Sequence, residues 1–233
     1  MNLKNKVVFI TGASRGIGLA TVKKFASNGW KVVGFYNQRE GEQIENVFWY
    51  QLEISEYGSI KESFQKAFDD FGRIDAFVNC AGIFGYKDLS NYDEDLMDKL
   101  IAVNEKGTYL TTKEILNKMT DGTIVYISST AAQVGSTDPI YAGTKSAVLG
   151  FTKAMAKALA PKIRVNSVSP GVTNSDMTKN MNPERLALLK DLTLLKRVAE
   201  CEDIANTIYF LSTEESKHIT GSCIDINGGY VLR

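Results

Sequence analysis

Residues 11–18 read "TGASRGIG", and this stretch decides which fold the chain can adopt. It directly follows the apolar run "KVVFI" and opens a helical pattern over residues 16–27. Gly12 permits a tight turn, while Gly16 and Gly18 let the backbone and the helix approach a ligand without Cβ interference. The N–H groups and positive dipole at the start of that helix would then face an anion such as a pyrophosphate. The order of strand, glycine-rich turn and helix predicts the opening of a βαβ nucleotide-binding fold.

Outward from this stretch, short β-branched or aromatic runs alternate with longer helical patterns. Further strands are predicted in "KVVGFY", "VFWYQL", "DAFVN", "TIVYISS", "IRVNSVS" and "SCIDIN". Helices are predicted to end near Gly72, to cover about 93–117 and 139–160, and to include "CEDIANTIYFLS". Seven strands with mainly helical crossovers predict an α/β fold: a single-domain Rossmann-type, doubly wound parallel sheet with helices on both faces, over residues 1–233.

One segment, about 172–195, breaks this alternation. It follows "SPG" and is rich in methionine and leucine. An insertion of this length between a strand and the next helix is typical of a lid over a substrate. A helical excursion that packs on the edge of the sheet is the alternative.

Composition excludes several classes of function. The chain has 27 Lys and Arg and 27 Asp and Glu, with no basic block, so neither a nucleic-acid partner nor a charged membrane surface is expected. The N-terminal apolar run is shorter than a signal-peptide core, and no stretch approaches a membrane span. The three cysteines, Cys80, Cys201 and Cys223, are typical of reduced thiols in a cytoplasmic protein. The single histidine, His218, predicts neither a metal site nor Ser-His-Asp hydrolysis.

The spacing Tyr-x-x-x-Lys occurs three times, at 57–61, 109–113 and 141–145, so spacing alone identifies no site. Only Tyr141 follows a strand that ends in hydroxyl residues and also begins its own helix, with Asp138 as N-cap and Pro139 in the first helical position. Ligands of doubly wound sheets bind outside the carboxyl ends of the strands. The pair at 141–145 is therefore predicted to do chemistry, and the other two pairs to be structural.

A phenol with a pKa of about 10 is a poor acid at neutral pH. Lys145, one helical turn from Tyr141, is expected to stabilise the phenolate as a neighbouring cation. A seryl hydroxyl at the end of the preceding strand is expected to hold a substrate oxygen as charge develops on it. Ser128 and Ser129 compete for that role.

Several motifs together resemble the short-chain dehydrogenase/reductase family over essentially the whole chain. They are "TGASRGIG", "NCAG" at 79–82, "VNEKGTYL", "YISS", "YAGTK", "SPGV" and "ITGSCIDINGG". The resemblance implies a catalytic set of Asn104, Ser129, Tyr141 and Lys145. In the reductive direction Tyr141 would give a proton to a carbonyl oxygen that Ser129 holds. The resemblance further implies that Lys145 binds the nicotinamide ribose and that Asn104 positions water for a proton relay.

The same resemblance, with the strand ends, implies a binding site for a nicotinamide cofactor. Its predicted residues are Gly12, Ser14, Arg15, Gly16, Ile17, Gly18, Asn37, Arg39, Glu53, Ile54, Asn79, Ala81, Gly82, Tyr141, Lys145, Pro170, Gly171, Thr173 and Ser175. Substrate contacts are predicted for Ser129, Gln133 and Tyr141, and no metal is expected.

The end of the second predicted strand favours NADP(H) over NAD. It offers Tyr36 and Asn37, with no carboxylate in the sequence there to repel a 2′-phosphate. Arg15 and Arg39 stand near in sequence to attract one. NAD remains the alternative cofactor.

These expectations describe an oxidoreductase that transfers hydride between NADP(H) and a small-molecule ketone or secondary alcohol. The C-terminal third is most similar to β-ketoacyl carrier-protein reductases, which implies a 3-oxoacyl thioester. Only Lys118 and Lys162 stand near the places where that subgroup carries arginines for an acidic carrier, so carrier-bound and free substrates both remain open. The family resemblance also implies a homotetramer or homodimer built through the long helices.

The alternative from a different class is a catalytically silent nucleotide-sensing or scaffold protein on the same fold. The presence of all four predicted catalytic residues favours the enzyme.

Overall fold

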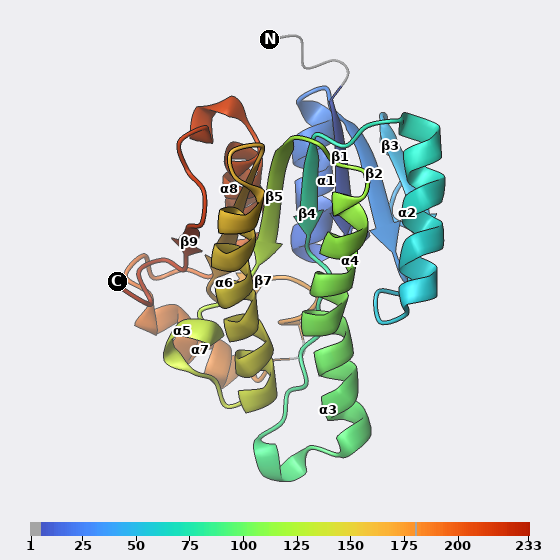
Figure 1. Ribbon diagram of the computed structural model, residues 1–233. Coiled ribbons are helices and arrows are strands. Elements are labelled where there is room, and N and C mark those ends of the chain that lie inside the picture. Colours follow the sequence, from blue (N-terminus) through green and yellow to red (C-terminus); the bar gives the residue numbers. More distant parts are fainter. Residues whose placement is uncertain (1–5, 180) are drawn as a thin grey trace.

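The computed structural model describes residues 6–179 and 181–233, and its centre is a seven-stranded parallel sheet (Figure 1). The strand order is β3-β2-β1-β4-β5-β6-β9, and every neighbouring pair is parallel. The strands are β1 Val7–Thr11, β2 Lys31–Tyr36, β3 Val47–Gln51, β4 Ala76–Asn79, β5 Gly122–Ile127, β6 Ile163–Pro170 and β9 Cys223–Ile226. The order changes direction between β1 and β4, which is where doubly wound sheets bind ligands. The predicted α/β fold class is confirmed.

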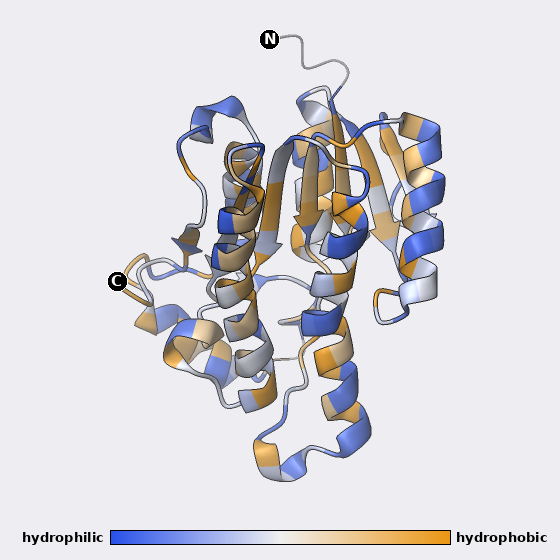
Figure 2. Ribbon diagram, viewed as in Figure 1, coloured by the Kyte–Doolittle hydropathy of each residue, from blue (hydrophilic) through white to orange (hydrophobic). Residues whose placement is uncertain are grey.

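Helices cover both faces of the sheet, so the sheet is the middle of three layers (Figure 1). One face packs against α1 Gly16–Ser27 and α8 Cys201–Leu211; the other packs against α2 Tyr57–Phe71, α4 Gly107–Leu116 and α6 Pro139–Leu159. Successive residues of β1 serve both layers, since Phe9 lies in one core cluster and Val8 in the other. Figure 2 shows the result as largely hydrophobic strands between helices that carry hydrophilic residues along their length. Burial on both faces explains why these strands are almost continuously apolar.

The helix predicted over 93–117 is interrupted in its middle. It consists of α3 Glu94–Ile101, a π-helical segment Ala102–Lys106, and α4. Asp93 caps its start by accepting a hydrogen bond from the Leu96 N–H at 2.8 Å. The predicted helix is confirmed, and the π segment inside it, whose middle residue is Asn104, was not predicted. Single π turns within helices are frequent at functional sites.

Helix α6 begins where the sequence predicts. The Asp138 carboxylate accepts a hydrogen bond from the Tyr141 N–H at 2.9 Å, and Pro139 occupies the first turn. The preceding connection contains a short helix, α5 Ala131–Val134. Tyr141 therefore lies in the first turn of α6, at the carboxyl end of the sheet.

The segment predicted as a lid, 172–195, begins in one strand of a small separate sheet, and the other strand follows shortly after its end. The two strands, β7 Thr173–Asn174 and β8 Ala199–Glu200, are parallel and were not predicted, because two-residue strands have no periodicity. Between them lies α7 Pro183–Leu192. Two hydrogen bonds join this segment to loops beside the sheet: Tyr86 Oη donates to the Met177 carbonyl, and Arg185 Nη2 donates to Thr137 Oγ1 at 2.8 Å.

Other features are simple to place. Short 3₁₀ turns lie at Leu89–Asn91 and Glu214–Ser216. Within the described ranges no helix is both long and apolar enough to cross a membrane, and no group of three or more His, Cys, Asp or Glu side chains is arranged to hold a metal ion. The three cysteines are free thiols, and His218 is exposed.

Candidate active site

The carboxyl end of β5 and the first turns of α6 bring Ser129, Tyr141 and Lys145 together. Only 8% of Tyr141 and 5% of Lys145 are exposed. The Ser129 hydroxyl is near enough to the Tyr141 phenol to lower its pKa. The Ser128 hydroxyl instead donates to the Lys145 carbonyl at 2.9 Å. Of the two competing serines, Ser129 is thus the one that faces Tyr141.

Lys145 places a buried cation beside the phenol ring. Its Nζ lies 5.7 Å from the centroid of the Tyr141 ring and donates to the Ile127 carbonyl at 2.9 Å. Burial lowers the pKa of Lys145 to about 8, because a charged amine is disfavoured away from water. The ammonium form therefore predominates at neutral pH and is lost a little above it.

The acidity of Tyr141 reflects its surroundings. Burial raises its pKa to about 12, and the Ser129 hydroxyl offsets only part of that rise. Desolvation of the buried phenol is the largest influence on this pKa, and the stabilisation of the phenolate by Lys145 stays a prediction. Tyr141 consequently holds its proton until a stronger base forms next to it.

Asn104 is buried, and its amide is committed to the loop after β4. Oδ1 accepts from the Ile83 N–H at 2.8 Å, and Nδ2 donates to the Ile83 carbonyl at 2.9 Å. A longer contact joins Nδ2 to Thr144 Oγ1 at 3.3 Å. The side chain thus braces the loop against the π segment and against α6, a role that the sequence did not reveal. Its predicted positioning of water stays a prediction.

The glycine-rich turn has the shape that a phosphate group requires. Gly12 has φ +61°, and a Cβ there would lie 2.7 Å from the Ala81 Cα; a Cβ on Gly18 would lie 2.0 Å from the Gly12 carbonyl oxygen. The N-cap of α1, Arg15, makes no side-chain capping bond, so among the described residues its side chain does not occupy the first N–H groups of the helix. A backbone without Cβ atoms at Gly12 and Gly18, together with the N–H groups at the start of α1, fits the pyrophosphate of a dinucleotide.

Two further residues of the predicted cofactor site line the same edge of the sheet. A Cβ on Gly82 would lie 3.3 Å from Lys145 Nζ and 3.4 Å from Asn104 Oδ1, so glycine leaves these polar atoms uncovered. The Ala81 N–H donates to Thr11 Oγ1 at 3.2 Å, which joins the loops after β1 and β4.

Asn79 does not present its side chain to a ligand. It is 3% exposed, accepts from Thr11 Oγ1, and donates to Thr108 Oγ1 at 2.9 Å. The side chain of Asn79 is thus a brace beneath the site, and a cofactor contact of Asn79 through its backbone stays a prediction. Ile17 and Ile54 also direct their side chains into the core clusters, which leaves only their backbone groups for a ligand.

The loop after β6 closes the far side of the glycine-rich turn. The Ser175 Cβ lies 3.7 Å from the position of a Cβ on Gly16, and both residues line a cavity of about 260 Å³. Thr173 is buried and donates to the Gly171 carbonyl at 3.0 Å, while the Pro170 carbonyl accepts from the Thr130 N–H. Ser175 is therefore the better placed of the two predicted hydroxyls. Ser14 is half-buried within the turn itself.

The region expected to select the cofactor contains the predicted cofactor residue Glu53, but its position beside Asn37 was not predicted. Asn37 Nδ2 donates to Glu53 Oε2 at 2.8 Å. The expectation that no carboxylate stands beside Asn37 is wrong, because β2 and β3 are parallel neighbours and their following residues meet at the same edge. Although burial opposes it, hydrogen bonds from Ser55 and Asn37 lower the pKa of Glu53, which keeps it ionised. Arg15 and Arg39 are exposed.

The predicted substrate residue Gln133 is fixed in orientation. Its Nε2 donates to Asp225 Oδ1 at 2.6 Å, and Asp225 is paired with Arg233. Because a carboxylate accepts only from the amide NH₂, the amide cannot be reversed. Its Oε1 is buried, with no hydrogen-bond partner among the described residues.

An aromatic wall beside Tyr141 was missed by the sequence analysis. The ring centroid of Phe84 lies 4.5 Å from that of Tyr141 at an interplanar angle of 73°, and Tyr86 packs edge-on against Phe84. Tyr86 has φ +58°, an uncommon conformation for a side chain of this size. The signal in the sequence was the aromatic pair in "GIFGY", directly after the "NCAG" motif.

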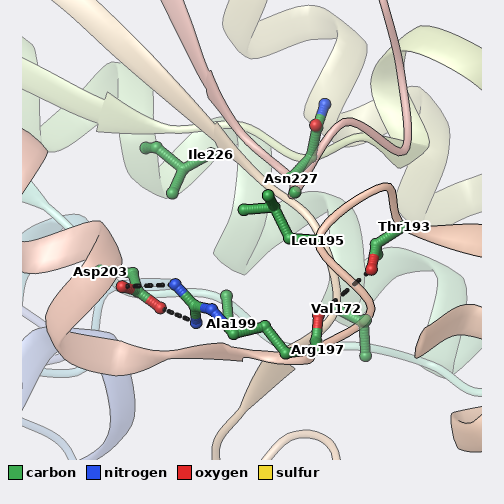
Figure 3. A pocket seen from close by; sticks show the side chains of 9 residues that line it. Val172, Thr193, Leu195, Arg197, Ala199, Asp203, Ile226 and Asn227 are labelled. Atoms are coloured by element: carbon green, nitrogen blue, oxygen red, sulfur yellow. Dashed lines mark hydrogen bonds and ion pairs between the residues drawn. The ribbon is translucent and has the colours of Figure 1, made fainter. Parts of the chain in front are cut away.

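A second cavity, of about 160 Å³, lies at the base of the predicted lid (Figure 3). Val172, Leu195 and Ile226 give it apolar walls, and an ion pair between Arg197 and Asp203 lies beside them. Neither Ser129, Tyr141 nor Lys145 lines it. It is therefore separate from the candidate active site.

Comparisons with known proteins agree with this geometry. A family profile described as "Enoyl-(Acyl carrier protein) reductase" matches residues 12–231. The chain is 35% identical to the 3-oxoacyl-(acyl-carrier-protein) reductase of Thermotoga maritima and 32% identical to that of Vibrio cholerae, with full coverage of all chains.

Solved structures show the same likeness. A short-chain dehydrogenase/reductase from Brucella melitensis, described as glucose/ribitol dehydrogenase, matches with a TM-score of 0.94 at 30% identity, over 100% of both chains. The aldohexose dehydrogenase of Thermoplasma acidophilum matches with a TM-score of 0.92 at 29% identity, over 100% of this chain and 96% of the other.

A doubly wound sheet, a glycine-rich turn at its switch point and a buried Tyr-Lys pair beside a serine define a nicotinamide-dependent oxidoreductase. The chain belongs to the short-chain dehydrogenase/reductase family.

Proposed function

We propose that this enzyme uses NADP(H) to reduce the ketone of a 3-oxoacyl thioester to a secondary alcohol. The observation that carries the proposal is the buried Tyr141 with Ser129 and Lys145 against it. The relatives in Thermotoga maritima and Vibrio cholerae, named as 3-oxoacyl reductases, support the choice of substrate. Nothing in the fold or in the comparisons favours a catalytically silent protein.

Each residue has a defined task in this reaction. Hydride transfer is the chemistry that a nicotinamide cofactor supplies when bound. The N–H groups of the glycine-rich turn would hold its phosphates, with Ser175 facing them from the opposite loop and Lys145 binding the ribose. Ser129 donates a hydrogen bond to the carbonyl oxygen as negative charge develops there.

Tyr141 then gives that oxygen its proton. A phenol with a pKa of about 12 keeps its proton at working pH, and an alkoxide is a strong enough base to take it. The nearby ammonium of Lys145 stabilises the phenolate that remains. The burial that makes Tyr141 a weak acid towards water therefore does not prevent it from acting as the proton donor.

The cofactor preference rests on two arginines and is opposed by one carboxylate. Exposed Arg15 and Arg39 provide positive charge for a 2′-phosphate, whereas ionised Glu53 beside Asn37 provides the opposite charge. We expect a higher kcat/KM with NADPH than with NADH, and a reduced ratio in Arg39→Ala. Lys217→Ala, an exposed lysine far from this edge, is the matched control and should leave the ratio unchanged.

Charge placement supports a proposal about the carrier protein. Lys118 is buried and ion-paired with Glu114 at 2.7 Å, so it offers no free charge to an acidic carrier, while Lys162 is exposed. We propose that the acyl part, packed against the Phe84 wall, is recognised and the carrier contributes little. A free 3-oxoacyl thioester and its carrier-bound form should then give kcat/KM values within a few-fold.

The substrate test has clear alternatives. Purified enzyme is assayed by NADPH oxidation with 3-oxoacyl thioesters and by NADP⁺ reduction with aldohexoses and ribitol. Faster turnover of the sugars would replace the thioester proposal with a polyol substrate. Turnover that persists in Tyr141→Phe would remove the proposed mechanism.

We also propose a cytoplasmic homotetramer or homodimer built on the outer faces of α4 and α6. The half-buried ring pair of Tyr109 and Phe151, with centroids 4.5 Å apart, lies on those helices and supports this choice. The segment 172–195 is proposed as the substrate lid, since Tyr86 and Arg185 join it to loops beside Tyr141. Light scattering that gives a monomer at micromolar concentration would contradict the assembly.

A further inference from the structure

We propose that Asp138 is a positioning residue for catalysis: its buried carboxylate joins the first turn of α6 to the loop after β4, and so sets Tyr141 against Phe84. The inference rests on the proposed role of Tyr141 as proton donor. It goes beyond the helix-capping function that the sequence predicts for Asp138.

The carboxylate has more partners than an N-cap needs. Asp138 is 1% exposed. Its Oδ1 accepts from the Tyr141 N–H at 2.9 Å and from the Tyr92 hydroxyl at 2.7 Å, and its Oδ2 accepts from the Gly85 N–H at 3.0 Å. Only the first bond belongs to helix capping. Because an ionised carboxylate is costly to bury without donors, these bonds hold three separate segments to one another.

The loop after β4 is shaped to meet this carboxylate. A Cβ on Gly85 would lie 1.9 Å from the Tyr92 Oη and 2.9 Å from Asp138 Oδ2, so only glycine lets the backbone come this close. Phe84 directly precedes Gly85, and its ring packs on Tyr141 at 4.5 Å. The Asp138 carboxylate therefore holds both rings of the Phe84–Tyr141 pair in place. It accepts from the Tyr141 N–H and from the N–H of Gly85, the residue after Phe84.

Two substitutions distinguish the proposed link between α6 and the loop after β4 from the role of Asp138 as N-cap of α6. Asp138→Ser keeps a good N-cap for α6 but is too short to reach Gly85 and Tyr92. Asp138→Asn keeps an acceptor for Tyr141 and turns its NH₂ towards the Gly85 N–H, which removes the bond to the loop. Because small displacements of reacting groups are expensive in rate, we expect kcat to fall about 10- to 100-fold in both. The KM for the nicotinamide cofactor should change less than about twofold, since no contact of Asp138 lies in the glycine-rich turn.

Asp93→Asn is the matched control, because it makes the same chemical change at the exposed N-cap of α3. It should have the kcat of the parent enzyme. If both Asp138 variants fail to fold, Tyr92→Phe removes one donor and keeps the cap; its kcat should fall by a smaller factor, about 2- to 10-fold, with the cofactor KM unchanged.

The outcomes separate this inference from the proposed function. If Asp138→Ser folds and keeps the kcat of the parent enzyme, the proposed role of Asp138 is wrong. If only Tyr92→Phe folds, a parental kcat in that variant has the same meaning. The proposed role is also wrong if kcat falls only in proportion to the fraction of folded protein, or if the KM for the cofactor rises by the same factor as kcat falls. Loss of helix capping alone would explain either result. Tyr141→Phe is assayed in parallel. If that variant is active, the proposed function itself fails; if it is inactive while Asp138→Ser is fully active, only this inference fails.

Discussion

Helices α2 and α6 both carry a tyrosine in the first turn and a lysine four residues later, yet the two pairs lie in opposite environments. The lysine Nζ is 5.9 Å from the ring centroid in the Tyr57–Lys61 pair and 5.7 Å in the Tyr141–Lys145 pair. Lys61 is exposed and Tyr57 half-buried, whereas Lys145 and Tyr141 are buried. Spacing and cation-to-ring distance are therefore the same at a surface and at a candidate active site. Burial at a strand end, beside Ser129, makes the difference.

In the third pair, Tyr109 and Lys113, both side chains interact with other groups. Tyr109 Oη donates to Glu105 Oε1 at 3.1 Å, and Lys113 Nζ lies 5.1 Å from the ring of Tyr57. The lysine thus contacts another helix, and the tyrosine hydroxyl has an acidic partner. Burial and that carboxylate raise the pKa of Tyr109 to about 12 without placing it near a strand end.

The largest effect is expected from Tyr141→Phe. Loss of the proton donor should lower kcat by about 10²- to 10⁴-fold, the usual contribution of a positioned general acid. Tyr57→Phe and Tyr109→Phe are matched removals of one hydroxyl and should retain most activity. Steady-state assays of the three variants, with circular dichroism to verify folding, make the comparison. Equal losses in all three would show that the difference in environment has no catalytic meaning.

A pH profile tests the two lysines next. Burial lowers the pKa of Lys145 to about 8, so its ammonium is complete below that pH and is lost above it. Reductive kcat/KM should therefore fall above pH 8, by about tenfold at pH 9. Lys145→Arg should have a flatter alkaline limb at lower activity, because guanidinium stays charged. Lys61→Met should keep the parental profile, and a profile that is level from pH 6 to 10 would contradict the assignment.

The smallest effect concerns the starts of the two helices. Asp138 caps α6, but the N-cap of α2, Glu56, makes no side-chain capping bond. Glu56→Asp keeps the charge and brings a shorter carboxylate to the first-turn N–H groups, so the free energy of unfolding should rise by about 0.5–1 kcal/mol. Urea unfolding measures the gain. Kinetic constants should be unchanged, and a change in kcat would mean that α2 is coupled to the site.

Local chemistry in the sequence was sufficient for most of the fold. The glycine spacing in residues 11–18, the period of the helices and the Asp138–Pro139 start of α6 are each decided by neighbours along the chain. All seven strands of the main sheet were predicted from their short β-branched or aromatic runs, and central strands such as β1 and β4 are apolar because they are buried along their whole length. The parallel order then placed the predicted residues at one edge.

What could not be predicted depends on residues that are distant in sequence. Asn37 meets Glu53 only because β2 and β3 end side by side. Asp138 could be recognised as a cap, but its bond to Gly85 spans 53 positions. Lys118 gave no sign of being buried, since its partner Glu114 makes the same i,i+4 pair that exposed helices carry. The raised pKa of Tyr141 likewise reflects burial, which spacing does not report.

The π segment Ala102–Lys106 absorbs one extra residue without changing how the helices on either side of it face the sheet. A π turn holds one residue more than a regular helical turn, so its five residues cover nearly the same rotation as four α-helical residues. Helices α3 and α4 therefore keep almost the relative phase of an unbroken helix that is one residue shorter. The irregularity is confined to the turn in which Asn104 bonds to Ile83. Deleting one residue there should leave the buried face of α4 on the sheet and disturb the Asn104–Ile83 bonds, so activity should fall more than the free energy of unfolding.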